Sequence, residues 1–363
     1  MPVRPHAPDG AVVLFLVFSQ GYTRVAAVPA FSFARHSDTA TLDSRKVSGA
    51  ANIRDMSAQL KQKVPGVEAM VSITAHVPDD AVSAGLLGTE RVGHGARIRA
   101  DGLIATIGYV VQEAEHVWIG TRSTVVPGFV VGYDFDSGFA LVKPTLPLHG
   151  TCMELGRAAS LRIGDAVSVM SSGGNTQVIE ARVVAKQEFA GRWEYVLDQA
   201  VFTAPPHDSW SGAALVDSEG RLCGLGSLVI QGFEINGAAS TVNMFVPIDL
   251  LVPIVDELCA NGRRLSPPRP WLGMLVHDDQ QDLTVVGVYR NCPADKAGLR
   301  PGDVIVGIDD EPVTGLANMF RRVWSLGSAG VEVPVSVLRN TEKMELMVRS
   351  GDRAGFQRKG TLQ

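Results

Sequence analysis

The sequence predicts a mainly β protein built from two domains. With 363 residues, the chain exceeds the usual size of a single domain, about 100 to 200 residues. Short runs rich in Val, Ile and Leu recur along most of the chain, separated by Gly, Asp or Pro. Such strands without intervening helices indicate a β-barrel or a β-sandwich. A proline-rich segment at residues 263–270 has the composition of a semi-rigid linker and divides the chain.

The first 34 residues have the layout of a secretory signal peptide. An apolar run at residues 11–18 precedes small residues near Ala30 and Ala34 that suit a cleavage site. A disordered tail is the alternative, because Arg24 falls between the run and these sites. The run is shorter than the roughly 20 residues that span a bilayer, and no later segment is long enough. We therefore expect an exported, periplasmic protein without a stable membrane span.

The first domain is predicted to consist almost entirely of strands. Helical spacing of apolar residues at 53–64 precedes a strand at 67–75. Further strands are expected at residues 95–104, 116–119, 126–131, 139–142, 166–170, 178–184, 195–201, 213–216 and 222–230. A helix at 250–258 follows, with Pro253 delaying or kinking its start and Gly262 placed to cap its end.

The second domain reads as a smaller α+β unit from Trp271 to about Arg349. Its expected elements are a strand at 283–288, a helical turn at 293–299, a strand at 304–308, a helix at 316–324 and a hairpin of residues 331–338 and 343–348.

Composition excludes several classes of protein. Hydrophobic residues make up 45% of the chain, charged residues 20%, and the formal net charge is −5, so no nucleic-acid binding is expected. The four cysteines, Cys152, Cys223, Cys259 and Cys292, lack the spacing of a zinc or redox motif. We interpret them as small hydrophobic residues, although export would allow two of them to oxidise. No metal or organic cofactor is expected.

Residues 293–309, PADKAGLRPGDVIVGID, closely resemble the central motif of bacterial PDZ domains. They follow WLGM at 271–274, which is similar to the carboxylate-binding loop of those domains. In such a loop, backbone N–H groups hold a peptide's C-terminal carboxylate, and the adjoining sheet edge accepts the peptide as an added strand. The resemblance implies that peptides or unfolded segments bind at Trp271, Leu272, Gly273, Met274, Leu275, Leu316, Met319, Phe320 and Val323. For each apolar side chain, filling the domain core is an equally good interpretation.

Upstream, motifs in the expected order resemble the protease domain of the HtrA (Deg) family over roughly residues 54–259. They are GHG at 93–95 with DGLIATIGYVV at 101–111, DFDSGFALVK at 134–143, LRIGD at 161–165, SWSGAALVD at 209–217 and MFVPID at 244–249. The resemblance implies a trypsin-like double β-barrel at 35–262, the linker at 263–270, a PDZ domain at 271–351 and a tail at 352–363. It also implies assembly as a homo-oligomer, a trimer in that family.

The catalytic positions of that family are altered here. By resemblance, Tyr109 stands in place of the histidine, Gly138 in place of the aspartate, and Ser211 keeps the serine. A tyrosine of ordinary pKa near 10 is protonated at neutral pH and is a poor base, while glycine has no carboxylate. Ser209 and Trp210 replace the family's Gly-Asn pair, which removes the glycine of the oxyanion hole. Efficient triad proteolysis is therefore not expected.

Other residues could replace the base only if the fold brings them to Ser211. His207 lies four residues before Ser211, and His94 stands where the family has a serine. Short spacing alone does not position a side chain, so we favour a loop role for His207. Asp134 and Asp136 flank the vacated aspartate position and suit turn or surface roles.

Two functions follow from these residues. The favoured one is a proteolytically silent HtrA-like protein that binds peptides or unfolded segments through its PDZ domain, in protein quality control. The alternative is a serine endopeptidase with an unconventional active site that uses Ser211.

Overall fold

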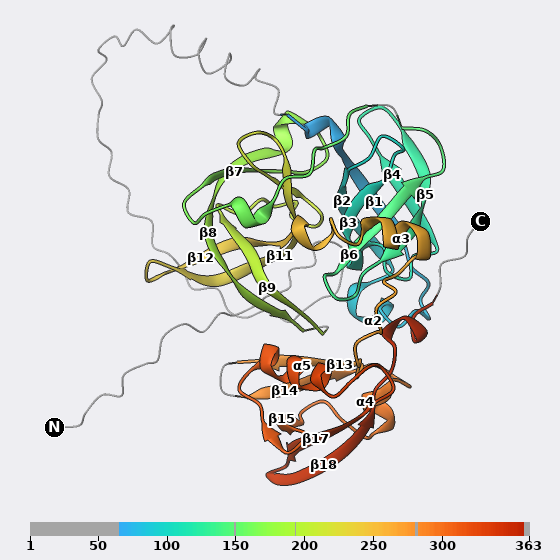
Figure 1. Ribbon diagram of the computed structural model, residues 1–363, viewed down its shortest axis with the longest axis vertical. Helices are drawn as coiled ribbons and strands as arrows, with labels where there is room; N and C mark the ends of the chain where they lie inside the picture. Colours follow the sequence, from blue (N-terminus) through green and yellow to red (C-terminus); the bar gives the residue numbers. More distant parts are fainter. Residues whose placement is uncertain (1–64, 149, 193, 280–281, 359–363) are drawn as a thin grey trace, which may run out of the picture. The chain divides into compact units, whose positions relative to one another are not determined.

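The computed structural model describes residues 65–358 except residues 149, 193, 280 and 281. The signal segment predicted at 1–34 and the helix predicted at 53–64 lie outside the described residues. The architecture is mainly β, as predicted, with two closed barrels followed by an α+β unit (Figure 1). Within the described part of the chain, no helix is long and apolar enough to cross a membrane.

Six antiparallel strands close the first barrel. They are β1 (Met70–His76), β2 (Glu90–Arg97), β3 (Ile104–Ile107), β4 (His116–Gly120), β5 (Val125–Tyr133) and β6 (Phe139–Pro144). Their order is β1-β2-β3-β6-β5-β4, and pairing of β1 with β4 completes the closure. Side chains of β1 alternate, so that Val71, Ile73 and Ala75 fill the interior, as a strand with one buried face requires.

The prediction of a single strand at residues 95–104 is wrong, because a turn interrupts it. The backbone N–H of Ile98 donates to the carbonyl of Leu103 at 2.8 Å, and Gly102 has a φ of 89°. Both Ile98 and Leu103 are buried, so the apolar pattern of the strands continues through the turn. Hydrophobic periodicity alone could not place this chain reversal.

The second barrel repeats the strand order of the first. Its strands are β7 (Ala166–Met170), β8 (Val178–Gly191), β9 (Tyr195–Ala204), β10 (Ala214–Val216), β11 (Leu222–Ile235) and β12 (Ala238–Pro247). Around the barrel they follow β7-β8-β9-β12-β11-β10, which is the path of the first barrel. Phe202 and Phe245 are among its largest fully buried side chains.

Short helical elements connect and close the barrels. They are η1 (Val67–Ala69), α2 (Ala84–Leu87), η2 (Gly108–Val110), η3 (Ala158–Ser160), η4 (Asn175–Gln177), η5 (Ile248–Leu250), α3 (Val255–Asn261) and, near the C-terminus, η6 (Arg353–Gly355). Helix α3 begins two residues after Pro253, as the proline predicts. Gly262 caps it with a φ of 73° and donates its N–H to the Leu258 carbonyl at 2.9 Å.

The C-terminal unit is an antiparallel sheet with two helices. Its elements are β13 (Met274–Asp278), β14 (Leu283–Val288), α4 (Pro293–Lys296), β15 (Val304–Ile308), β16 (Glu311–Pro312), α5 (Leu316–Ser325), β17 (Glu332–Arg339) and β18 (Glu342–Arg349). The sheet order is β13-β14-β15-β17-β18, and β16 pairs with β15. Strand β13 therefore lies at one end of the sheet, and its second edge has no strand partner among the described residues.

Candidate functional site

The fold brings together the three positions that the resemblance matches to a catalytic triad. Tyr109 lies in η2 after β3, Gly138 directly precedes β6, and Ser211 lies in the turn before β10. The phenolic oxygen of Tyr109 is 3.0 Å from Oγ of Ser211. The N–H of Gly108, next to Tyr109, donates to the Gly138 carbonyl at 2.7 Å. The residues matched by resemblance thus share one site, although they come from both barrels.

The Tyr109 hydroxyl occupies the place where a base would act on Ser211. Besides Ser211, it contacts the carbonyl oxygen of Ser227 at 2.9 Å. A carbonyl can only accept a hydrogen bond, and the phenol has one proton, so Tyr109 cannot donate to both partners at once. Ser227 lies at a register shift between β11 and β12, between the paired residues Gly226 and Leu228. Tyr109 therefore satisfies a buried acceptor and anchors the serine.

Tyr109 remains neutral at every physiological pH. Desolvation raises the pKa of its hydroxyl well above the usual value near 10, outweighing the opposite effect of the hydrogen bond with Ser211. An efficient base at neutral pH needs a pKa near 7. A neutral phenol cannot accept the Ser211 proton to any useful extent.

Gly138 leaves the aspartate position without a charge. A Cβ atom built on Gly138 meets no atom within 4 Å, so the space for a side chain is open. The nearby carboxylate of Asp134 is buried and accepts hydrogen bonds from the Ser137 hydroxyl at 2.5 Å and the Ser137 N–H at 3.1 Å. Asp136 instead pairs with Arg264 at 3.2 Å. Asp134 stabilises its own turn, as predicted, and does not replace the missing carboxylate.

The backbone N–H at the position of the oxyanion-hole glycine already makes a hydrogen bond within the protein. The N–H of Ser209 donates to Nδ1 of His207 at 2.9 Å. This Nδ1 is therefore unprotonated, and Nε2 lies 3.2 Å from the carbonyl of Gln177, to which it donates. Both ring nitrogens of His207 bind the backbone, so this histidine holds the turn before Ser211. The Ser209 N–H is thus occupied by His207 and is not available to an oxyanion.

His94 is likewise not placed to act as a base on Ser211. Its Nδ1 lies 2.9 Å from Oγ of Ser172 and accepts the Ser172 N–H at 3.3 Å. Burial, with a smaller effect of His207, lowers the pKa of His94 to about 4. Among the described residues, neither His94 nor His207 is hydrogen-bonded to the Ser211 hydroxyl. Trp210 lies beside Tyr109, with ring centroids 6.5 Å apart, and adds an aromatic wall to the site.

The residues predicted to bind a peptide surround β13 and α5. Leu272, Met274, Leu316, Met319, Phe320 and Val323 are at most 5% exposed and belong to the core of the C-terminal unit, while Leu275 is partly exposed. Core packing is the second of the two roles that the sequence left open for them. The loop before β13 contains Gly273 with a φ of 79°, a backbone conformation that suits glycine.

Sequence reasoning missed one residue at this loop, Glu194. It lies between β8 and β9 of the second barrel, and its carboxylate accepts the backbone N–H groups of Leu272, Gly273 and Met274. Nothing in the local sequence marks this contact, which joins positions about 80 residues apart.

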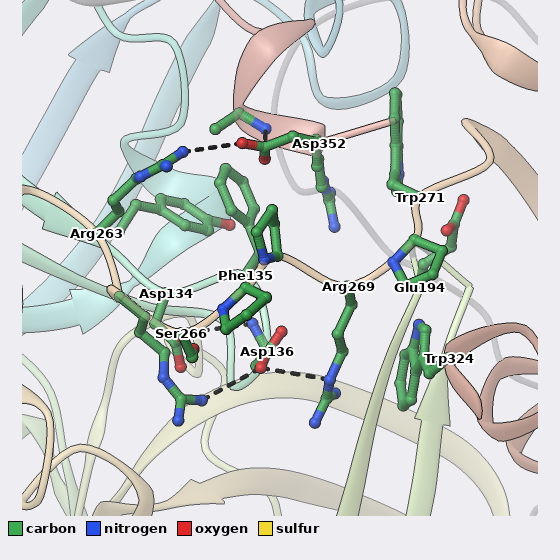
Figure 2. A pocket seen from close by; sticks show the side chains of 17 residues that line it. Asp134, Phe135, Asp136, Glu194, Arg263, Ser266, Arg269, Trp271, Trp324 and Asp352 are labelled. Atoms are coloured by element: carbon green, nitrogen blue, oxygen red, sulfur yellow. Dashed lines mark hydrogen bonds and ion pairs between the residues drawn. The ribbon is translucent and has the colours of Figure 1, made fainter. Parts of the chain in front are cut away.

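Glu194 and Trp271 also line a cavity of about 70 Å³ beside the linker (Figure 2). On its floor Asp136 pairs with Arg264 and with Arg269 of the linker. The cavity is far smaller than the roughly 300 Å³ of a typical ligand site. We therefore assign it a structural role. Within the described residues, no group of three or more His, Cys, Asp or Glu side chains is arranged to hold a metal ion.

Comparisons with known proteins match both parts of the chain. A family model described as a trypsin-like peptidase domain matches residues 93–225, and one described as a PDZ domain matches residues 270–349. Relatives named as DegP-like periplasmic serine endoproteases include those of Hahella chejuensis, 27% identical over 282 residues, and Pseudomonas putida strain W619, 26% identical over 282 residues. Each alignment covers 72% of this chain but only 57% and 56% of these relatives.

One similar solved structure is that of the HtrA-type protease AlgW with a decapeptide, which is 22% identical in sequence and has a TM-score of 0.46. The match covers 82% of this chain and 98% of that chain. A serine endoprotease from Yersinia pestis has a TM-score of 0.45 and 20% identity, covering 81% and 97%. The match to a trypsin-like peptidase domain, the match to a PDZ domain and the DegP-like relatives together support an HtrA-type protein.

Proposed function

We propose that this HtrA-type chain binds peptides or unfolded segments through its PDZ domain and does not cleave them by triad chemistry. The observation that carries the proposal is the Tyr109 hydroxyl, which lies 3.0 Å from Ser211 and stays protonated. A serine hydroxyl attacks a carbonyl only when a base removes its proton.

The expected loss of rate is large. Proteases without a triad member retain about 10³- to 10⁴-fold catalysis over water, which comes from the oxyanion hole and substrate binding. Here the Ser209 N–H is bound to His207, so even this residual contribution is weakened. Ser211 thus lacks a base, an orienting carboxylate and one oxyanion donor together.

Peptide binding is the activity that the remaining features support. The loop at 271–274 and the unpaired edge of β13 suit an extended peptide with a free C-terminal carboxylate. The same proposal includes domain limits at 35–262 and 271–351, export to the periplasm after a signal at 1–34, and assembly as a homotrimer. DegP-like relatives named as periplasmic support the location.

Casein cleavage tests the proposed lack of proteolytic activity. The purified protein and Ser211→Ala are incubated with casein under identical conditions. We expect equal, background cleavage by both proteins. A clear wild-type activity that Ser211→Ala abolishes would overturn the proposal and favour the endopeptidase alternative.

A peptide array tests the binding part. Peptides with free C-termini are compared with the same sequences carrying C-terminal amides. We expect the protein to bind only free C-termini, because the amide removes the charge that the loop accepts. Equal binding of both sets would refute carboxylate recognition.

A further inference from the structure

The carboxylate-binding loop is already filled by a side chain of the same chain. One carboxylate oxygen of Glu194 accepts the N–H of Gly273 at 2.9 Å and of Met274 at 3.4 Å. The other accepts the N–H of Leu272 at 3.2 Å. Three successive backbone donors that converge on one carboxylate form the arrangement by which a PDZ loop holds a peptide's C-terminus.

The β8–β9 hairpin, whose turn contains Glu194, also contacts both walls of the predicted groove. On the β13 side, Arg192 lies 3.1 Å from Nδ1 of His277. On the α5 side, Arg321 binds Asp198 of β9 at 2.6 Å and also Glu188 of β8. The β8–β9 hairpin is therefore fixed to the strand and to the helix between which a peptide would lie.

Apolar contacts support the same placement. Ala190 of β8 and Val196 of β9 pack against the hydrophobic core of the C-terminal unit, the cluster that contains Met274, Phe320 and Val323. An extended PDZ ligand places apolar side chains against such residues while its carboxylate enters the loop. The hairpin supplies both features, an acidic group for the loop and apolar side chains for the groove.

The backbone of Glu194 is held in an uncommon conformation. Its φ is 64°, in the left-handed region that non-glycine residues seldom adopt, and its side chain is buried. Such a conformation persists when surrounding contacts determine it. Burial also raises the pKa of Glu194 to about 7, against the effects of the loop N–H groups and Arg353. The ordinary pKa of a C-terminal carboxyl, near 3.5, is lower than the 4.5 of a glutamate, so in the same loop it keeps its charge more readily than Glu194.

We infer that the β8–β9 hairpin is an internal ligand of the PDZ domain, with the Glu194 carboxylate in place of a peptide's C-terminus. A peptide can then bind only after the hairpin leaves the loop. This inference rests on the proposed peptide-binding function. The observed affinity for a peptide falls by the fraction of molecules in which the loop is open.

Hydrogen exchange tests the internal contact without any peptide. Exchange of the amides of residues 272–274 is measured in the full chain, in Glu194→Ala and in Glu180→Gln. Glu180 lies exposed on strand β8 of the same hairpin and provides a matched change of charge. We expect faster exchange in Glu194→Ala and wild-type exchange in Glu180→Gln. Unchanged exchange in Glu194→Ala, with its folding verified by circular dichroism, would overturn the inference.

Peptide binding tests the competition. A fluorescent decapeptide with an apolar, free C-terminus is titrated into the same proteins, with its amidated form as control. We expect Glu194→Ala to bind at least about tenfold more tightly than wild type, and Glu194→Gln to lie between them, since a neutral amide is the weaker acceptor. Arg321→Ala, which releases the hairpin from α5, should change affinity in the same direction.

The two proposals fail in different ways. Accelerated exchange in Glu194→Ala without peptide binding by any protein would support the internal contact and refute the proposed peptide-binding function. Equal peptide affinity of wild type and Glu194→Ala would overturn the internal-ligand inference and leave peptide binding intact.

Discussion

Replacing Tyr109 by Phe should destabilise the barrels, because the phenol has become a structural group. The change removes the hydrogen bond to the carbonyl of Ser227, which is buried at a register shift of the sheet, and the contact with Ser211. An unsatisfied buried acceptor costs about 1–3 kcal/mol. Ser211 is partly exposed, so water replaces part of its lost contact. We expect Tyr109→Phe to lower the free energy of unfolding by about 2 kcal/mol.

Urea unfolding followed by tryptophan fluorescence measures this loss, since Trp210 lies beside Tyr109. With a denaturant dependence of about 2 kcal/mol per M, the midpoint should fall by about 1 M. Ser211→Ala should cost less, about 0.5–1 kcal/mol, because it leaves the bond to Ser227 intact. Tyr133→Phe is the matched control, since its hydroxyl has no hydrogen-bond partner among the described residues. A Tyr109→Phe midpoint equal to that of Tyr133→Phe would refute the structural role.

Three further changes follow from the same site. Restoring the triad by Tyr109→His with Gly138→Asp should give only weak casein cleavage in a gel assay, because the Ser209 N–H still faces an imidazole and loss of one oxyanion donor lowers the rate about 10²- to 10³-fold. Cleavage as fast as that of an intact serine protease would contradict this. Burial depresses the pKa of His94 to about 4, so below pH 6.5 the unfolded chain binds a proton that the folded chain does not. In unfolding titrations, acidification to pH 4 should therefore lower the free energy of unfolding of the wild type by up to about 3 kcal/mol more than that of His94→Gln. Parallel dependences of the two free energies on pH would refute this. Gly212→Ala should prevent folding, since its Cβ would lie 1.9 Å from a backbone oxygen. Gly138→Ala has open space and should lower the stability by only about 1 kcal/mol, measured by thermal melting. Equal losses of stability in the two variants would contradict the packing argument.

The sequence predicts this fold well wherever local residues decide the backbone. Pro253 cannot continue a helix ladder, and Gly262 readily adopts a positive φ, so the limits of α3 follow from two residues. The turn at 98–103 escaped prediction because Ile98 and Leu103 are both buried and keep the apolar pattern of a strand. Local sequence thus predicts the ends of a helix where proline or glycine decides the backbone conformation. It fails to predict a turn whose residues are buried like those of a strand.

The site was predictable in part for a related reason. The matches of Tyr109, Gly138 and Ser211 to three catalytic positions needed only the order of motifs along the chain. The bond from Ser209 to His207 depends on the conformation of one turn, and spacing alone suggested either a base or a loop residue. The contact of Glu194 with the PDZ loop depends on the packing of two distant segments, which no local pattern encodes.

The same fold has a consequence for redox chemistry. All four cysteines are free thiols, and burial raises the pKa of both Cys223 and Cys292 to about 11. Only about one in 10⁴ of these two groups is a thiolate at pH 7, and the thiolate is the species that oxidants attack. Cys223 and Cys292 are therefore expected to react slowly with oxidants as long as the fold keeps them buried.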